Sequence, residues 1–355
     1  MAHQSKKSQR VLLTGNNGYL GAVMGPWLRN AGHDVVGLDT NYFADCTLAP
    51  DGEEIPTIRK DLREIEASDV EGFDAVIHLA ALSNDPIGNL NSRWTNQINF
   101  EGTIRAAKLA KAAGARRFIF SSSCIMYGMS TAAVADETSP LAPGTDYARS
   151  KVEAEMALRE LADDGFSPVY CRNGTVYGLS PRMRFDTVLN NFMGSACATG
   201  RIEVFSDGAP WRPVVHIQDV ARAFEMMLTA PIEKVHNEAF NIGADKLNYQ
   251  IRDLAEIAAR AVPGCELVQT PRPGADQRTY RAGFDKFSRT FPDFAFRWTA
   301  EEGARRLYEA FRSIGLTAAE FVDKRFTRLQ WLRHLVDNGL VDNDLFWTVK
   351  AARAA

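Results

Sequence analysis

The stretch Arg10-Val-Leu-Leu-Thr-Gly-Asn-Asn-Gly-Tyr-Leu-Gly21 joins a short apolar run to three glycines spaced three residues apart. An apolar run that ends in a glycine turn predicts a buried parallel strand followed by a helix, which we expect over about residues 18–31. Gly15 permits the tight turn, Gly18 lets the backbone approach a pyrophosphate, and Gly21 lets the helix pack on the strand. Because the motif follows a predicted strand and opens a predicted helix, it indicates a dinucleotide site rather than a bare turn.

Strands and helices alternate along the first half of the chain. Further strands are expected at about residues 34–38, 57–60, 74–79, 117–121 and 168–172, with helices over about 93–113 and 147–161. This alternation predicts an α/β fold, a Rossmann-type doubly wound parallel sheet with a smaller C-terminal substrate-binding lobe. Such sheets bind their ligands at the carboxyl ends of the strands, where Gly15, Leu79 and Ser123 are expected.

Composition and the pattern of predicted strands and helices divide the 355 residues into four segments. Residues 1–9 are a polar, basic leader that we expect to be disordered, and residues 10–177 form the dinucleotide-binding domain. The alternation then loosens, so we expect a substrate-binding lobe over 178–314, with one segment returning to the first domain. Residues 315–355 predict a helical tail that serves packing or subunit contact. Its apolar stripe is Leu329, Leu332, Leu335 and Val336.

The bulk properties exclude several classes of protein. A formal net charge of −3 gives no basic footprint for nucleic acid. No apolar run approaches the roughly 18 residues that a membrane span requires, and the N-terminus lacks the apolar core of a signal peptide. The cysteines show neither close pairing nor zinc-site spacing, so we expect reduced thiols, no metal and a cytoplasmic location. They are Cys46, Cys124, Cys171, Cys197 and Cys265.

Asp39 indicates which dinucleotide binds. It ends the second expected strand, 18 residues after Gly21, and an acid about 20 residues after the last glycine binds the ribose 2′-hydroxyl and repels a 2′-phosphate. We therefore favour NAD over NADP; the alternative is a solvated loop aspartate. Asp61 and Leu62 would flank the adenine. The predicted cofactor contacts are Gly15, Asn17, Gly18, Tyr19, Leu20, Gly21, Asp39, Asp61, Leu62, Leu79, Ala80 and Ala81, together with Tyr147 and Lys151.

A tyrosine and a lysine one helical turn apart supply the reacting group. In Tyr147-Ala-Arg-Ser-Lys151 the two side chains share a helix face. An ammonium that close favours the phenolate, so the pKa of Tyr147 can fall from about 10 toward neutrality. Ser123 can donate a hydrogen bond to the same substrate oxygen. These residues predict a site that binds a dinucleotide, deprotonates a substrate hydroxyl and moves a hydride, with Tyr147 as the base.

Taken together, these residues resemble the extended short-chain dehydrogenase/reductase superfamily. More narrowly, they resemble its NAD-dependent epimerase/dehydratase family, which acts on nucleotide sugars, over about residues 10–310. The segment Ser121-Ser-Ser-Cys-Ile-Met-Tyr-Gly128 matches the family's serine-rich strand end, and counting back four residues from its tyrosine selects Ser123 as the catalytic hydroxyl. The resemblance implies that Tyr147 is the base and that Lys151 also holds the nicotinamide ribose.

The two positions after Ser123 separate the reactions of the family. Similar 4,6-dehydratases carry an acid and a base there, whereas this chain has Cys124 and Ile125, which disfavours dehydration. We expect Cys124 to be a packing residue; the less favoured alternative is that it acts as a base. What remains is an epimerase, in which Tyr147 takes a hydroxyl proton and bound NAD takes and returns the hydride through a transient keto-sugar. The alternatives are a nucleotide-sugar 4-ketoreductase or dehydrogenase and, less favoured, a 4,6-dehydratase or a non-enzymatic dinucleotide sensor.

The resemblance also implies a nucleotide-sugar site in the lobe. Arg212 and Arg278 resemble arginines that grip the diphosphate, a role that suits the guanidinium group. Asn191 matches an asparagine that reaches the same phosphates. Thr175 stands where the family often has an asparagine, so the identity of the sugar stays open, and Ser83 is a further candidate substrate contact.

Other polar residues carry secondary expectations. Arg182 and Arg184 are extra phosphate candidates, the alternative being a solvated loop. Asp219 is expected to cap the helix that follows it, and His216 to be structural. Asn99 resembles an asparagine that braces the sheet in this superfamily. The family further implies a homodimer, while the nucleotide, the sugar and the inverted carbon are not specified by the sequence.

Overall fold

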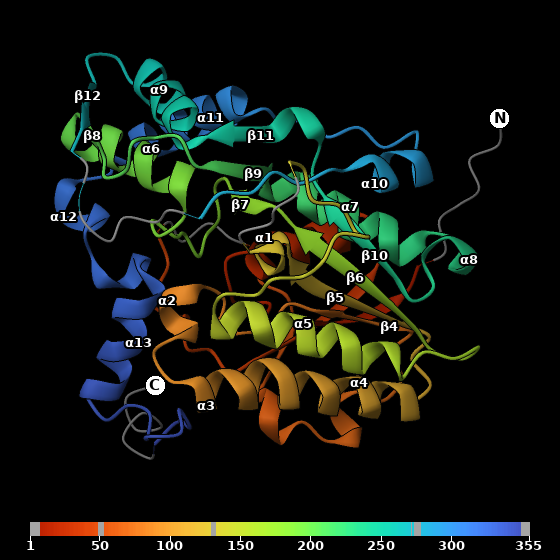
Figure 1. Cartoon of the computed structure of the whole chain (residues 1–355). Helices are drawn as coiled ribbons and strands as arrows, with labels where there is room; N and C mark the ends of the chain where they lie inside the picture. Colours follow the sequence, from red (N-terminus) through yellow and green to blue (C-terminus); the bar gives the residue numbers. More distant parts are fainter. Residues whose placement is uncertain (1–7, 49–52, 129–132, 271, 273–277, 349–355) are drawn as a thin grey trace.

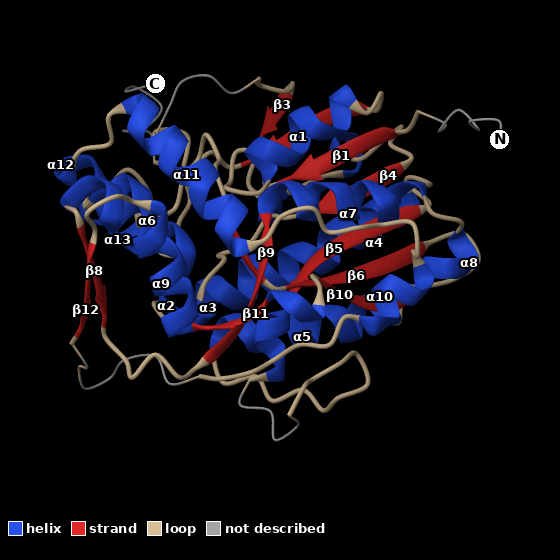
Figure 2. Cartoon of the chain, turned by 90° about the horizontal axis from the view of Figure 1, so that it is seen from above, coloured by secondary structure: helices blue, strands red, loops and turns tan. Residues whose placement is uncertain are grey.

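The structure is a computed structural model that describes residues 8–48, 53–128, 133–270, 272 and 278–348. Most of the expected leader lies outside the described residues, as do the end of the expected tail and the residues directly before Arg278. Both faces of a central sheet are covered by helices, and a second lobe adjoins the sheet (Figures 1 and 2).

The central sheet has seven strands, and all of its neighbouring strands are parallel. In spatial order they are β10 (Glu238–Ile242), β6 (Ser167–Asn173), β5 (Arg117–Ser123), β4 (Ala75–His78), β1 (Arg10–Thr14), β2 (Asp34–Asp39) and β3 (Thr57–Arg59). The chain winds outward from β1 to β3 and then from β4 to β6 on the other side. This order confirms the predicted Rossmann-type doubly wound sheet and places its switch point between β1 and β4.

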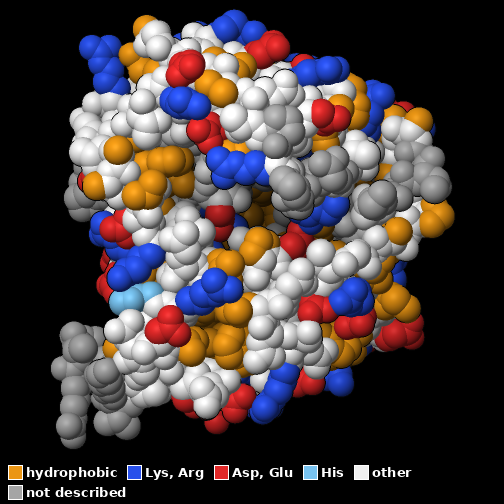
Figure 3. Space-filling view, turned by 60° about the vertical axis from the view of Figure 1, so that its left-hand side comes forward, with side chains coloured by type: hydrophobic (Ala, Val, Ile, Leu, Met, Phe, Trp, Pro, Cys, Tyr) orange, Lys and Arg blue, Asp and Glu red, His pale blue; other side chains and the backbone are white. Residues whose placement is uncertain are grey.

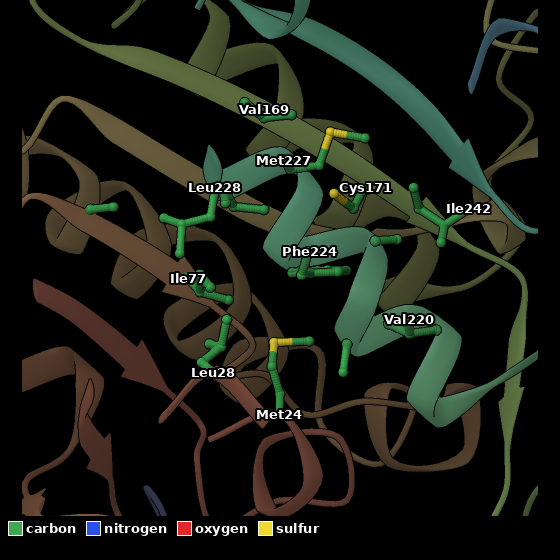
Figure 4. Packing of buried hydrophobic residues seen from close by; sticks show 14 of the residues in the cluster. Met24, Leu28, Ile77, Val169, Cys171, Val220, Phe224, Met227, Leu228 and Ile242 are labelled. Atoms are coloured by element: carbon green, nitrogen blue, oxygen red, sulfur yellow. The ribbon is translucent and has the colours of Figure 1, made fainter. Parts of the chain in front are cut away.

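Two helix layers bury the faces of the sheet. Helices α1 (Gly21–Asn30) and α7 (Ile217–Thr229) cover one face, and α4 (Gly102–Ala112) and α5 (Asp146–Arg159) cover the other. Figure 4 shows the apolar side chains of α7 between those of α1 and those of the strands. Each fully buried side chain of this kind contributes about 1.5–3 kcal/mol of hydrophobic stabilisation. The layers therefore fix the carboxyl ends of the strands, where a ligand binds.

The helix expected over about residues 93–113 is interrupted. Helix α3 (Ser92–Thr95) leads into a π-helical segment, Asn96–Glu101, before α4 begins. Asn99 lies in this segment and is fully buried. Its Oδ1 accepts from the Leu82 amide at 2.8 Å, and its Nδ2 donates to the Leu82 carbonyl at 3.2 Å and to Ser150 Oγ at 3.2 Å. Asn99 thus braces the loop after β4 against α5, which is a structural role.

The C-terminal lobe is built around smaller sheets. One consists of β11 (Asn248–Gln250), β9 (Trp211–His216) and β7 (Thr175–Tyr177), and the other of β12 (Glu266–Gln269) and β8 (Arg201–Val204). Their helices are α6 (Val188–Thr199), α9 (Ile251–Ala261) and α11 (Ala300–Ile314), which share one apolar cluster. Shorter helices are α2 (Asp85–Gly88), α8 (Ile232–Val235) and α10 (Asp285–Thr290). Between α7 and β11 the chain returns to the main sheet as β10.

The end of the chain packs back against the first domain. Helices α12 (Ala318–Phe321) and α13 (Arg328–Asp337) follow the lobe, and α13 lies beside α2, at the left of Figure 1. Of the predicted apolar stripe, Leu332 and Leu335 are buried, and Leu329 and Val336 are partly buried in the same cluster.

The expectation that Asp219 caps the following helix is wrong. Helix α7 begins at Ile217, and His216 is its N-cap, with Nδ1 accepting from the Gln218 amide at 3.3 Å. Asp219 lies inside the first turn and is fully buried. Its carboxylate instead accepts from the backbone amides of residues 297 and 298 at 2.8 and 3.1 Å. His216 is buried and stacks on a tryptophan ring at 4.1 Å, so it is structural, as expected.

Candidate active site

A cavity of about 830 Å³ runs from the glycine turn to the C-terminal lobe. The carboxyl ends of the central strands form its floor, and residues of the lobe and of α13 form its walls. The face shown in Figure 3 is hollowed near its middle, with Lys and Arg side chains around the hollow. Of the residues that the sequence singles out for cofactor or substrate, all but Asn17 and Arg182 line this cavity.

The glycine turn is packed so tightly that side chains cannot replace Gly15 or Gly21. Gly15 has φ +75°, and a Cβ there would lie 2.7 Å from the Ala80 backbone nitrogen. A Cβ at Gly21 would lie 2.3 Å from the Gly15 carbonyl oxygen. At Gly18 a Cβ would approach one atom within 4 Å, the Gly15 oxygen at 3.2 Å, so its other side is open. This bare backbone at the start of α1 fits a pyrophosphate.

Asp39 holds the glycine turn and faces the cavity. One carboxylate oxygen accepts from the Asn17 amide at 2.9 Å, and the other accepts from the Asn41 amide at 2.7 Å. Burial raises the pKa of Asp39 above its ordinary value, and these amide hydrogen bonds oppose that rise. The Asn17 side chain donates to Asn41 Oδ1 at 2.7 Å. Asn17 therefore stands behind the turn, where its amide positions Asp39.

The expected adenine side is held by an ion pair. Asp61 caps a short 3-10 helix that begins at Leu62, and it binds the Arg63 guanidinium at 2.7 Å. The Tyr42 hydroxyl oxygen lies 3.3 Å from the same carboxylate. Because Arg63 and the backbone engage the Asp61 carboxylate, this residue fixes the shape of the cavity wall. Leu62 supplies apolar surface to the same wall.

The two hydroxyls expected to react meet where β5 and α5 converge. Ser123 ends β5, and its Oγ accepts from the Ile125 amide at 3.3 Å. Tyr147 lies in the first turn of α5, half-buried, and close enough to Ser123 for the serine hydroxyl to lower the pKa of its phenol. A Cβ at Gly88 would lie 2.8 Å from Tyr147 Cβ, so α2 presses directly on this tyrosine. The tyrosine is therefore held in one position beside the serine.

The expectation that Lys151 brings the pKa of Tyr147 toward neutrality is wrong for the protein alone. Burial raises the pKa of Tyr147 to about 12, and the Asp85 charge raises it too, while the Arg184 charge and the Ser123 hydrogen bond oppose the rise. Lys151 is buried, and its Nζ donates to the Ser121 carbonyl at 2.8 Å. Burial also lowers the pKa of Lys151 to about 7, against the effect of Glu155. Desolvation therefore has the largest effect on the pKa of this phenol.

Cys124 points away from the cavity. It is fully buried, its Sγ donates to the Arg172 carbonyl at 3.1 Å, and burial raises the pKa of its thiol. Beneath it, Arg172 forms a buried ion pair with Glu155 at 2.7 Å. Ile125, the next residue, lines the cavity. The strand end therefore presents three serines and an isoleucine to the cavity, and the cysteine is a packing residue.

The lobe brings the predicted substrate residues to the opposite end of the cavity. Arg212 is buried and donates to the Trp211 carbonyl at 2.8 Å, with its guanidinium over a tyrosine ring at 5.6 Å. Arg278 forms an ion pair with Asp85. Asn191 donates to a backbone carbonyl of the lobe at 2.8 Å. Thr175 and Ser83 also line this part of the cavity.

Sequence reasoning missed three acidic residues of the site, Asp85, Asp186 and Glu203. Asp85, on α2, binds Arg278 from the lobe, and Asp186 binds Arg184 at 2.7 Å. Arg184 is itself buried and donates to the Ser83 carbonyl at 3.2 Å, so it does not belong to a solvated loop. The sequence carries no signal for the pairing of Asp85, because its partner lies far along the chain.

Comparison with known proteins identifies the family. The model of the family described as "NAD dependent epimerase/dehydratase family" matches residues 11–243. The chain belongs to this family. As a member of an NAD-dependent family with a glycine cradle that fits a pyrophosphate, it takes NAD as its cofactor.

This family member is similar to several curated proteins along most of its length. It is 27% identical over 296 residues to UDP-glucose 4-epimerase of Bacillus subtilis, covering 76% of this chain and 85% of that protein. It is 28% identical over 229 residues to UDP-glucose 4-epimerase of Mycolicibacterium smegmatis, covering 61% of this chain and 72% of that protein.

Among solved structures, it resembles MoeE5 in complex with UDP-glucose and NAD. The identity is 26% and the TM-score 0.73, with coverage of 86% of this chain and 99% of MoeE5. It shares its fold with UDP-N-acetylglucosamine 4-epimerase from Methanobrevibacter ruminantium M1 at 23% identity and a TM-score of 0.76, covering 86% and 99% of the two chains. Thus about 14% of this family member has no counterpart in MoeE5.

The described residues offer neither a metal centre nor a membrane-spanning helix. No group of three or more His, Cys, Asp or Glu side chains in them could hold a metal ion. Within the same ranges, no helix has the length and apolar character that crossing a bilayer requires.

Proposed function

We propose that the protein is an NAD-dependent epimerase of a nucleotide-diphosphate sugar, acting through a transient keto-sugar. The observation that carries the proposal is the pairing of the Ser123 and Tyr147 hydroxyls at the cavity wall, beside Lys151 and opposite the arginines of the lobe. That pairing provides a base for one sugar hydroxyl. NAD, when bound, accepts the hydride from the same carbon and returns it, and its positive nicotinamide ring favours the phenolate.

Side chains of the protein accept and return the proton of the sugar hydroxyl. Tyr147 takes the proton of the reacting hydroxyl and later gives it back, while Ser123 donates a hydrogen bond to the same oxygen. Lys151 holds the nicotinamide ribose and adds positive charge near the phenol. Because the phenol of the protein alone has a raised pKa of about 12, the phenolate depends on the cationic ring, so the base forms where the cofactor is bound.

The cavity does not favour loss of water from the sugar. Dehydration needs a second acid and base, and each carboxylate among the described residues that line the cavity is already engaged. The amides of residues 17 and 41 hold Asp39, and arginines hold the others: Asp61, Asp85, Asp186 and Glu203. Cys124 is turned away and Ile125 has no proton to transfer. Inversion by hydride return needs none of these groups.

The lobe supplies the groups for the diphosphate. Arg212 and Arg278 suit bidentate contact with phosphate oxygens, and Asn191 lies on the same wall. The curated relatives are UDP-glucose 4-epimerases, which makes a UDP-hexose the first substrate to try and C4 the first carbon to follow. The family resemblance further leads us to propose a homodimer.

The test is turnover by purified protein without added cofactor. UDP-, GDP-, CDP- and dTDP-sugars are each incubated with the protein and followed by proton NMR. We expect a C4 epimer to accumulate from at least one sugar, with NAD released from the protein on denaturation. A reaction that requires added NADH or NADPH would instead indicate the ketoreductase, and a product lacking the elements of water would indicate a dehydratase.

A further inference from the structure

The end of the chain lies against the strand end that carries Asp39. We call residues 327–348 the C-terminal strap. Trp331 Nε1 donates to the Tyr42 carbonyl at 2.6 Å, and Trp347 Nε1 donates to the Thr40 carbonyl at 2.5 Å. The Tyr42 hydroxyl in turn donates to the carbonyl of Leu345. The loop that follows β2 is therefore tied to the strap at both of the strap's ends.

An apolar cluster fixes the strap in this place. Side chains of the strap pack with residues of the loop after β2 and with residues of α2 and α3. The fully or nearly buried members include Tyr42, Leu82, Ile87, Trp94, Leu332 and Leu335. Trp94 Nε1 also donates to the Asn343 carbonyl at 2.8 Å, and Arg63 stacks on Phe346 with 3.7 Å to the ring centroid. The strap is thus part of the packed structure.

The strap forms one wall of the cofactor cavity. Asp39, Thr40 and Phe43 line the cavity beside the glycine turn, and residues 327–329 line it from the strap. The family match ends at residue 243 and MoeE5 matches 86% of the chain. The cavity wall therefore includes residues beyond the part that defines the family.

Arg328 is the cation that this wall presents. It is 2% exposed, its guanidinium donates to the carbonyls of Arg182 and Arg325 at 2.8 and 3.3 Å, and it stacks over Phe43 at 4.4 Å. Within the described residues its guanidinium forms no salt bridge; the Asp186 carboxylate accepts from the Arg328 backbone amide at 3.2 Å and acts on the Arg328 charge without contacting the guanidinium, being paired with Arg184. Its charge acts on both Asp39 and Tyr19, which border the glycine turn.

A buried guanidinium that donates to carbonyls alone is costly unless an anion completes the site. Burial and the nearby Arg184 charge lower the pKa of Arg328 to about 10, so it still carries its charge at neutral pH. The glycine turn across the cavity is the part of the protein whose bare backbone fits a pyrophosphate.

We propose that Arg328 binds the pyrophosphate of NAD and that the C-terminal strap closes the cavity beside the adenosine half, so that the dinucleotide leaves slowly. Binding by Arg328 rests on the geometry of the cavity and on NAD as the cofactor. The value of slow release rests on the proposed function, because an epimerase must keep the cofactor between taking and returning the hydride.

The test measures NAD release from the full chain without turnover. Arg328→Met removes the cation, and Trp347→Phe removes the strap's hydrogen bond to Thr40 while keeping an aromatic ring. Arg333→Met removes an exposed arginine of the same helix and is the matched control. Each protein is loaded with NAD, diluted rapidly, and sampled for protein-bound NAD over time. UDP affinity is measured on the same preparations by calorimetry.

We expect Arg328→Met to release NAD about tenfold faster or more, since a charge-assisted contact is lost. Trp347→Phe should release it several-fold faster, and Arg333→Met at the original rate, with UDP affinity unchanged in all three. Original rates in both test variants would overturn the proposal. So would a weakened UDP affinity with unchanged NAD release, which would assign Arg328 to the substrate. If Arg328→Met does not fold, Trp347→Phe decides. Inactivity toward every sugar would not alter these rates.

Discussion

Replacing Gly15 by alanine should destabilise the protein and remove NAD from it. Gly15 has φ +75°, a region that costs a residue with a Cβ roughly 1–2 kcal/mol. The new Cβ would lie 2.7 and 2.9 Å from the nitrogen and Cα of Ala80. Both are backbone atoms, so no side-chain rotation relieves the contacts, and overpacking of this kind adds about 1–3 kcal/mol. We therefore expect the free energy of unfolding to fall by about 2–5 kcal/mol.

Gly32 offers a matched control for this substitution. Its φ is +93°, and a Cβ there would meet nothing within 4 Å. Gly32→Ala should therefore lose only the backbone cost of roughly 1–2 kcal/mol and keep its NAD. The assay is urea denaturation followed by circular dichroism, with NAD measured by absorbance after heat release. Equal stabilities and full NAD content in both variants would refute the reasoning about the turn.

Three further predictions concern the buried polar groups. Tyr147→Phe should keep NAD and lower kcat by about 100-fold or more, since the base is lost; undiminished turnover by NMR would contradict its assignment. Glu155→Gln breaks the buried ion pair with Arg172 and should lower the free energy of unfolding, measured in urea, by about 3–5 kcal/mol. The control Glu153→Gln, at an exposed position, should lower it by less than about 0.5 kcal/mol. Similar losses in the two variants would count against a stabilising role of the pair. Burial lowers the pKa of His216 from 6.5 to about 3, so below pH 6.5 the unfolded chain binds a proton that the folded protein does not. The free energy of unfolding should fall toward acid by about 1.4 kcal/mol per pH unit for this histidine. His216→Asn should flatten that slope, as denaturation at pH 6 and pH 5 would reveal.

The sheet could be predicted because its signals are local. The apolar run before Gly15 and the repeated alternation of strands and helices are readable within short windows of sequence. The predicted strands at about 34–38 and 117–121 correspond to β2 and β5, with β5 extending to Ser123. The interruption before α4 was missed, since a π-helical segment has no distinct sequence pattern, and it depends on the tertiary contact of Asn99 with Leu82.

The site was predictable where one short segment carries the chemistry. The glycine turn and the Tyr147 segment are of this kind. The pair Asp85–Arg278 was not predictable, because it depends on which distant segments the fold brings together. The raised pKa of Tyr147 was missed for a related reason: spacing along a helix reveals the neighbouring amine but not the loss of water that outweighs it.

The most direct measurement follows a hydride label through one turnover. A nucleotide sugar that the protein converts is prepared with deuterium at C4, and the purified protein is supplied with it in ordinary water without added cofactor. The account predicts an epimerised product that keeps the deuterium at C4. Deuterium lost to solvent, or a product formed without inversion at the labelled carbon, would contradict it.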